Sequence, residues 1–155
     1  MTSAPIAQQR LLIDLQDLDS HLARLRHERK HLPVLTRIEA VIERLKANKR
    51  AAIQAEAALD EAKKQATRSE DEVGQVARRA EVLRERLHSG TSAARDLSAI
   101  QGEIDQLGQR QSALEEAQIV AMEALDSARQ EAERLSREEA EIRAAGRDLT
   151  AKRDA

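Results

Sequence analysis

Apolar residues recur at every seventh position through two long stretches, and this repeat constrains the fold more than any other feature. An α-helix has about 3.6 residues per turn, so residues seven apart lie on one face and can pair with a second helix. One strip of the first stretch is Ile38, Leu45, Ala52, Leu59, Ala66, Val73, Ala80 and Leu87, and its neighbour is Val34, Val41, Asn48, Ala55, Ala62, Ser69, Val76 and Leu83. In the second stretch the strips are Ile100, Leu107, Leu114, Ala121, Ala128, Leu135, Ile142 and Leu149, and Leu97, Ile104, Gln111, Gln118, Leu125, Ala132, Glu139 and Gly146. The sequence therefore predicts two long helices with coiled-coil seams.

The composition excludes the other fold classes. The 155 residues include no Phe, Tyr, Trp or Cys, and only 5 Gly and 2 Pro. Aromatic residues supply much of the area that a compact core buries, and a multistranded sheet needs many turn residues. Disulfide scaffolds and cysteine zinc sites need Cys. We predict an all-α protein without a cofactor.

The segment from His88 to Ser92 is the one convincing turn between the two stretches. Gly90 suits the left-handed position after a helix, and Thr91, Ser92 or Asp96 can cap the next one. In an antiparallel hairpin, the numbers of facing residues have a constant sum, and a sum of 187 places small residues opposite large ones. It pairs Leu87 with Ile100, Leu59 with Ala128, and Leu45 with Ile142. We predict a hairpin over residues 34–153 that turns near 88–96.

Charge also favours antiparallel pairing. Residues 24–50 hold nine Lys or Arg and three acids, whereas residues 115–141 hold nine acids and three Arg. A hairpin lays part of the basic run beside part of the acidic run, although each exposed pair contributes little.

The first 32 residues carry a further apolar seam, which has no partner in the hairpin. It consists of Leu11, Leu15, Leu18, Leu22 and Leu25, with Leu32 one heptad further on. Because proline disfavours helix at the preceding residue, we expect residues 1–32 to form an additional helix broken off at Pro33. A homodimer through residues 6–32 would cover the seam. The alternatives are folding back onto the hairpin and a continuation of the second helix beyond Ala155, where no stop signal is visible.

Three groups of polar residues are candidate functional sites, and none of them predicts catalysis. The segment from His27 to His31 matches HExxH, but it lies at a charged helix end without a third ligand, so we expect no metal. A basic patch could meet phosphates, although it lacks interleaved aromatics. A projecting hairpin tip could hold a protein partner. The patch is Arg24, Arg26, Arg29 and Lys30, and the tip is Arg84, Arg86, His88, Thr91 and Arg95.

The segment after the turn resembles a known bacterial family. Asp96, Leu97, Gln101, Glu103, Ile104 and Leu107, preceded by Gly90 and followed by Leu114-Glu115-Glu116 and Met122-Glu123, are similar to the motif of proteins that join a long helical hairpin to a C-terminal four-cysteine zinc ribbon. The resemblance implies a non-enzymatic adaptor whose partners act in transcription or in flagellar or secretion regulation, and it also implies RNA binding. The zinc ribbon, and any zinc, is absent here because the chain has no Cys.

Two functions therefore remain open from the sequence. One is an adaptor that binds a protein partner, and the other is an RNA-binding protein that uses the basic helix surface, with the missing ribbon supplying most contacts. The net charge of -2 gives no global drive toward nucleic acid. Since no secretory signal and no apolar run of membrane-spanning length is visible, we expect a cytoplasmic protein.

Overall fold

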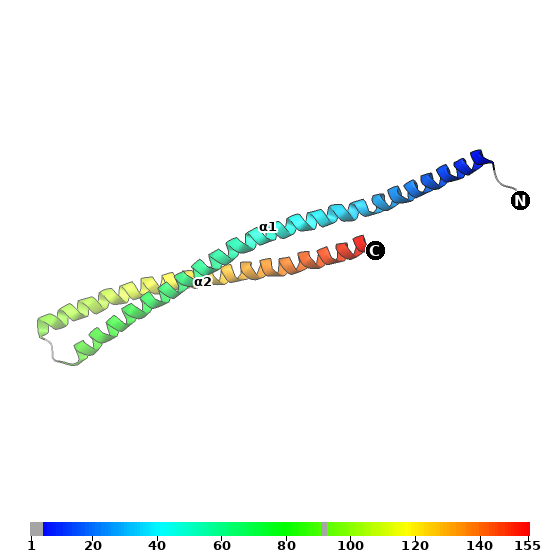
Figure 1. The fold of residues 1–155 in the computed structure, drawn as a ribbon. Helices are drawn as coiled ribbons and strands as arrows, with labels where there is room; N and C mark the ends of the chain where they lie inside the picture. The colour runs from blue at the N-terminus through cyan, green and yellow to red at the C-terminus, as the bar shows by residue number, and fades with distance from the viewer. Residues whose placement is uncertain (1–4, 91–92) are drawn as a thin grey trace. The chain divides into compact units, whose positions relative to one another are not determined.

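The fold is all-α, and its two long helices pack together as a hairpin, which confirms the predicted fold class. The computed structural model describes residues 5–90 and 93–155, and Figure 1 shows the two helices. Helix α1 spans Ile6–His88 and helix α2 spans Ala94–Asp154, with no strand among the described residues. The chain divides into two units: residues 1–49 with 138–155 form unit 1, and residues 50–137 form unit 2.

The predicted seams are the covered faces of both helices. Every one of the 32 positions in the four seven-residue strips is buried or partly buried, whereas most positions between them are exposed. This pattern arises because a helix with a narrow apolar stripe can bury only that stripe against one neighbouring helix. The heptad repeat therefore identifies the core residues correctly.

Unit 2 confirms the predicted register next to the turn. Leu83, Ile100 and Ile104 form a buried cluster, and Leu87 packs against it. Leu83 with Ile104, and Leu87 with Ile100, are pairs whose residue numbers add to 187. Ala80, which precedes Leu83 in the seam of α1, is completely buried, as expected for a narrow core that alternates small and large side chains.

Unit 1 keeps the same register. Leu45 and Ile142 line one groove, and the Cβ position of Gly146 would lie 3.3 Å from Cγ1 of Val41. Both pairs have residue numbers that add to 187. Ile142 is only 1% exposed and is the largest fully buried side chain of this unit. The predicted pair of Leu59 and Ala128 in unit 2 stays a prediction, although both residues are covered.

The predicted break at Pro33 is wrong, because α1 runs through this residue without interruption. Proline lacks the N–H that would bond the carbonyl of Arg29, and its ring crowds that carbonyl, at a cost of about 3 kcal/mol. Arg29 and Pro33 are both exposed, so water can reach the unbonded carbonyl. Ending the helix would instead free four carbonyls and four N–H groups. One local defect is therefore less costly than two new helix ends.

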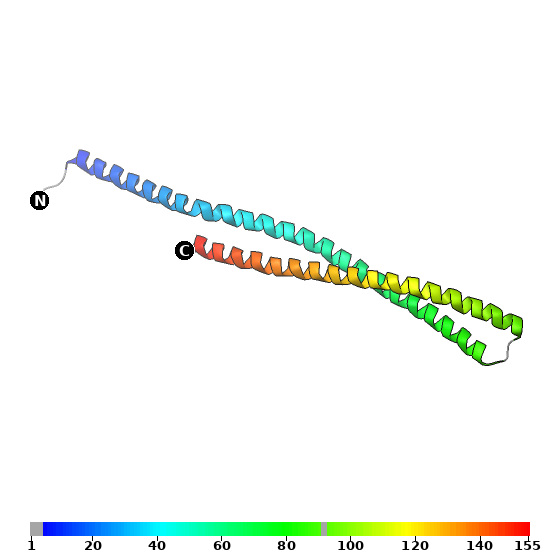
Figure 2. The same cartoon turned by 180° about the vertical axis from the view of Figure 1, so that it is seen from behind.

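The first turns of α1 in unit 1 carry an apolar face that no other described residue covers. Figures 1 and 2 both show this blue stretch of α1 extending past the red end of α2. The side chains of Leu11, Leu15, Leu18, Leu22 and Leu25, which we call the leucine seam, are 67%, 58%, 58%, 43% and 46% exposed. Residues 6–32 thus do not fold back across Pro33 onto the hairpin.

Candidate interaction surfaces

The turn of the hairpin is built by the chemistry of a few residues in unit 2. Gly90 has a φ of 68°, the left-handed conformation that glycine adopts without steric cost, and it follows directly after the last turn of α1. The N–H of Ser89 donates to the carbonyl of Glu85 at 3.0 Å, and its hydroxyl donates to the carbonyl of Arg86 at 2.8 Å. These bonds satisfy carbonyls at the end of α1.

The start of α2 differs from the predicted capping. The N–H of Leu97 bonds the carbonyl of Ala93 at 2.9 Å, so Ala93 is the N-cap residue and Asp96 is the third helical residue. A carboxylate there is favoured by the helix dipole. The other two predicted caps, Thr91 and Ser92, lie outside the described residues.

The predicted tip residues lie together at this end of unit 2, and all that the structure describes are exposed. Arg84 approaches Glu81 on its own helix at 3.7 Å. Arg86, His88 and Arg95 have no ion-pair partner within the described part of the chain, and Thr91 lies outside that part. The tip thus presents three cationic or imidazole groups to solvent above the apolar cluster.

A small groove beside the tip contains residues that the sequence did not single out as functional. Its volume is about 250 Å³, and it is lined by Arg86, Asp96, Ala99, Ile100 and Glu103. Glu103 also accepts hydrogen bonds from the guanidinium of Arg79 across the hairpin, with Nη2 at 3.2 Å and Nε at 3.3 Å. Charged side chains of both signs therefore line this groove together with Ala99 and Ile100, and we call it the tip groove.

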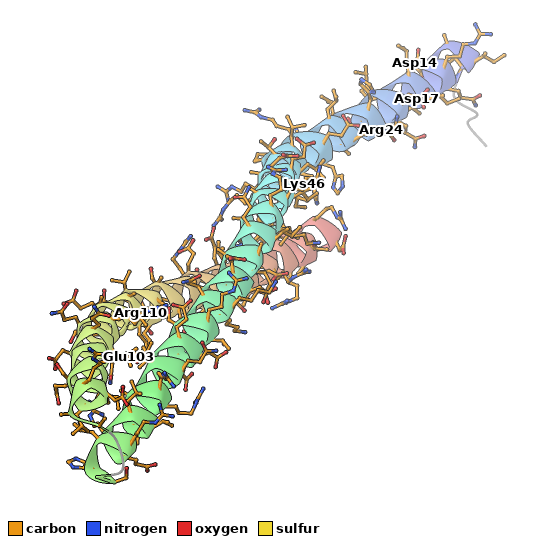
Figure 3. All side chains as sticks on the ribbon, turned by 90° about the vertical axis from the view of Figure 1, so that its left-hand side faces the viewer. Asp14, Asp17, Arg24, Lys46, Glu103 and Arg110 are labelled. Atoms are coloured by element: carbon orange, nitrogen blue, oxygen red, sulfur yellow. The ribbon has the colours of Figure 1, made fainter. Side chains whose placement is uncertain are left out.

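The predicted basic patch in unit 1 is exposed but does not form one face. Successive helical residues are rotated by about 100°, so Arg24 lies about 160° away from Arg26 around α1. Arg29 occupies a seam position between Leu25 and Leu32. Figure 3 shows acidic side chains, among them Asp14 and Asp17, on the same stretch of α1 as Arg24. The structure does not gather the four basic residues, Arg24, Arg26, Arg29 and Lys30, into a phosphate site.

The two histidines of the HExxH match do lie close together. Their ring centroids are 4.0 Å apart, and Nδ1 of His31 is 2.9 Å from the carbonyl oxygen of His27. In the described ranges, no group of three or more His, Cys, Asp or Glu side chains is placed to hold a metal ion. The pair has no third protein ligand of the kind that a catalytic zinc needs.

Charged side chains elsewhere form local pairs on their own helix. Arg134 donates to Glu131 at 2.8 Å and Arg143 donates to Glu139 at 2.8 Å. The hydrogen bond from Arg134 lowers the pKa of Glu131, because it stabilises the ionised carboxylate. Glu131 and Arg134 are both exposed, so this shift reflects a surface pair. No helix among the described residues is long and apolar enough to cross a membrane.

The fold and part of the sequence match known mycobacterial proteins. A solved structure from Mycobacterium smegmatis superposes with a TM-score of 0.73 and 26% identity, covering 99% of this chain and 63% of the other. "Uncharacterized protein MT2288" and "Uncharacterized protein Rv2229c", from two strains of Mycobacterium tuberculosis, are each 36% identical over 124 residues. This match covers 77% of the chain and 49% of each relative, so the chain spans about half the length of the curated relatives it matches.

The family comparison agrees with the geometry of the hairpin. The CT398-like coiled coil hairpin domain matches residues 15–155, a range that includes the seams of both helices and the turn. This range is well over half of the chain, and the paired strips and the register of the structure are those of a coiled-coil hairpin. The chain therefore belongs to the family of CT398-like coiled coil hairpin domains.

Proposed function

We propose that the chain is a non-enzymatic adaptor that binds a protein partner through the hairpin tip. The observation that carries this proposal is the set of exposed polar groups at the tip. The guanidinium groups of Arg86 and Arg95 and the imidazole of His88 have no ion-pair partner in the described ranges, and Arg86 lines the tip groove. Because the two helices hold the backbone of the tip, binding has to order only the side chains there. The partner is expected to present carboxylates to the arginines and an apolar side chain to Ile100.

The tip fits a protein surface better than a nucleic acid. A sequence-tolerant nucleic-acid site combines a continuous cationic groove with aromatic stacking platforms. The chain has no aromatic residue, and Asp96 and Glu103 line the tip groove, where they would repel phosphates. The basic residues of unit 1 are also spread around α1. The RNA-binding alternative is therefore the weaker one, and it becomes an outcome of the test.

The resemblance described above supports a regulatory setting for this adaptor. It places partners of similar hairpins in transcription and in flagellar or secretion regulation. A zinc ribbon of the kind associated with such hairpins would need cysteines, which these 155 residues lack. The proposal accordingly assigns the chain no metal, no cofactor and no catalytic residue, and it places the chain in the cytoplasm.

Site-specific photo-crosslinking in the cells that produce the protein tests this proposal. A photoreactive amino acid at position 88 should yield a protease-sensitive adduct of one discrete mass. That adduct should be lost when Arg86→Glu and Arg95→Glu are introduced together. The matched control pair, Arg68→Glu with Arg129→Glu, changes the same charge on exposed positions of unit 2 away from the tip, and the adduct should survive it.

Two results would contradict the adaptor proposal. One is a nuclease-sensitive adduct from position 88, which would mean that the tip contacts nucleic acid. The other is the same protein adduct in both double variants, which would mean that the tip arginines do not select the partner. Purified protein should also fail to bind a labelled single-stranded RNA of about 20 nucleotides at 50 mM salt, where phosphate contacts are strongest.

A further inference from the structure

We infer that the leucine seam pairs with the same seam of a second copy of the chain, antiparallel, in a register where the numbers of facing core residues add to 40. This inference goes beyond the tip-binding function and is independent of it. It rests on the exposed apolar face of α1 in unit 1 and on the charges that flank that face.

The seam has the geometry of an unpaired coiled-coil face. Its spacing alternates between four and three residues, so Leu15 and Leu22 occupy a positions and Leu11, Leu18 and Leu25 occupy d positions of a heptad. These five leucines are 43% to 67% exposed in the single chain. Contiguous apolar surface of this kind is unusual in a soluble monomer and marks an interface.

The hairpin of the same chain shows how flanking charges pair in an antiparallel arrangement. In unit 2 the facing core residues, such as Leu83 and Ile104, have numbers that add to 187. Arg79 and Glu103, which occupy the g positions just before core residues, form the cross-helix ion pair at 3.2 Å, and their numbers add to 182. The numbers of two facing g residues thus add to five less than the numbers of two facing core residues. By the same geometry, the numbers of two facing e residues add to five more than those of two facing core residues.

Burial of leucine alone does not select a register for two antiparallel seams. We call the sum of the residue numbers of two facing core residues the core sum. Registers with core sums of 33, 40 and 47 each place an a residue opposite a d residue, and each produces four leucine–leucine layers. With a sum of 40, Leu15 faces Leu25 of the second copy and Leu18 faces Leu22 of the second copy, and symmetry repeats both layers. The charges that flank the seam therefore have to select the register.

The register with a core sum of 40 places complementary groups on both flanks, an ion pair on one and a carboxylate facing an imidazole N–H donor on the other. Its g residues add to 35, so Asp14 faces His21 of the second copy. Its e residues add to 45, so Asp19 faces Arg26 of the second copy. Twofold symmetry makes two of each pair, and no like charges face each other.

The three competing arrangements, two antiparallel registers and the parallel pair, each place like charges together. A core sum of 33 brings Asp14 against its own symmetry mate and Asp19 against its own mate. A core sum of 47 brings Asp14 against Glu28 and brings the two Arg26 residues together. In a parallel pair, where g faces the following e, Asp14 meets Asp19. Charge complementarity thus singles out both the orientation and the register.

Disulfide crosslinking between single-cysteine chains tests the register directly, because the natural sequence has no Cys to interfere. A mixture of Leu18→Cys and Leu22→Cys chains should form a mixed disulfide under mild oxidation. A mixture of Leu15→Cys and Leu18→Cys reports the sum of 33, and a mixture of Leu22→Cys and Leu25→Cys reports the sum of 47. Leu18→Cys alone reports parallel pairing. Ser20→Cys, on the face opposite the seam, is the background control.

Sedimentation equilibrium of the 155-residue chain measures the strength of the association. Leu18→Glu with Leu22→Glu should weaken dimerisation on the order of a hundredfold, because it places carboxylates in the two central layers. Arg26→Asp should weaken it on the order of tenfold, and adding Asp19→Arg should restore it by exchanging the charges. Arg24→Asp makes the same change of charge at a position that is neither e nor g. This variant should leave dimerisation unchanged.

Three results would overturn the inference. A monomer at 100 μM that is unchanged by the leucine variants would show that the seam does not self-associate. Faster crosslinking in any mixture other than Leu18→Cys with Leu22→Cys would show a different register. Failure of the exchanged pair to recover dimerisation would show that the Asp19 and Arg26 residues do not face each other. None of these results bears on the tip, whose crosslinking test is separate.

Discussion

Gly146 on α2 lies directly against Val41 on α1 in unit 1, with only 3.3 Å between its Cβ position and Cγ1 of the valine. This distance is tighter than an ordinary van der Waals contact, so glycine permits a close approach of the two helices here. The same residue weakens α2 by about 1 kcal/mol relative to Ala, because glycine loses more backbone entropy. The contact accounts for a glycine in the interior of this helix.

A larger side chain at position 146 should destabilise unit 1. Gly146→Leu has to push Val41 away, and overpacking of this kind costs about 1–3 kcal/mol. Gly102→Leu is the matched control, because nothing lies within 4 Å of its Cβ position. Urea unfolding followed by circular dichroism should show a lower midpoint for the first variant only. Equal effects at both positions would mean that the close approach does not matter.

Replacing the internal proline should strengthen α1. Pro33→Ala restores the N–H that bonds the carbonyl of Arg29 and removes the ring clash, a local gain of up to about 3 kcal/mol. Slower hydrogen exchange of the amides around residue 33 would measure this gain. Pro5→Ala is the control, because Pro5 precedes the helix and its carbonyl accepts from Gln9 at 3.1 Å. Unchanged exchange in Pro33→Ala would contradict the continuous helix.

Truncating the core next to the turn should destabilise unit 2 strongly. Leu83 is 1% exposed and packs against Ile100 and Ile104, so Leu83→Ala should cost about 2–4 kcal/mol through lost contacts and a cavity. Its neighbour Val82 is 49% exposed, and Val82→Ala should cost less than about 0.5 kcal/mol. Thermal unfolding of both variants provides the comparison. Similar losses would argue against the register.

The surface pair of Glu131 and Arg134 should be visible in the titration of the carboxylate. Because the folded pKa of Glu131 lies below its unfolded value, the pair favours folding above the unfolded pKa, and this contribution is lost as the pH falls through the folded pKa. Arg134→Gln should raise the pKa of Glu131 toward its ordinary value, as measured by carboxyl NMR. The exposed position means that overall stability should barely change.

Metal should not be required for folding. His27 and His31 provide two nitrogens without a third ligand in the described ranges, so protein washed with chelator should keep its unfolding midpoint and contain no stoichiometric zinc. Zinc that is bound at one equivalent and lost on His31→Ala would show instead that the pair is a genuine site.

The candidate interaction surfaces were predicted less completely than the core. The tip arginines could be picked out because they flank a turn that Gly90 marks. Glu103 and Asp96 could not, because their place in the tip groove depends on how α2 is rotated against α1. The heptad assignment does contain a partial signal, since it makes Arg79 and Glu103 facing g residues of opposite charge.

The sequence by itself determined which faces of the helices are buried, where the chain turns and how the two helices of the hairpin are aligned. A period of seven and the pairing of small with large residues are properties of the linear chain, and one narrow seam leaves little choice of partner. Only the tertiary structure decided that α1 continues through Pro33, because an exposed carbonyl can be hydrated at less cost than two helix ends. It also decided that Gly146 lies in close contact with Val41 and that the leucine seam is left uncovered, since both depend on what lies opposite each residue in space.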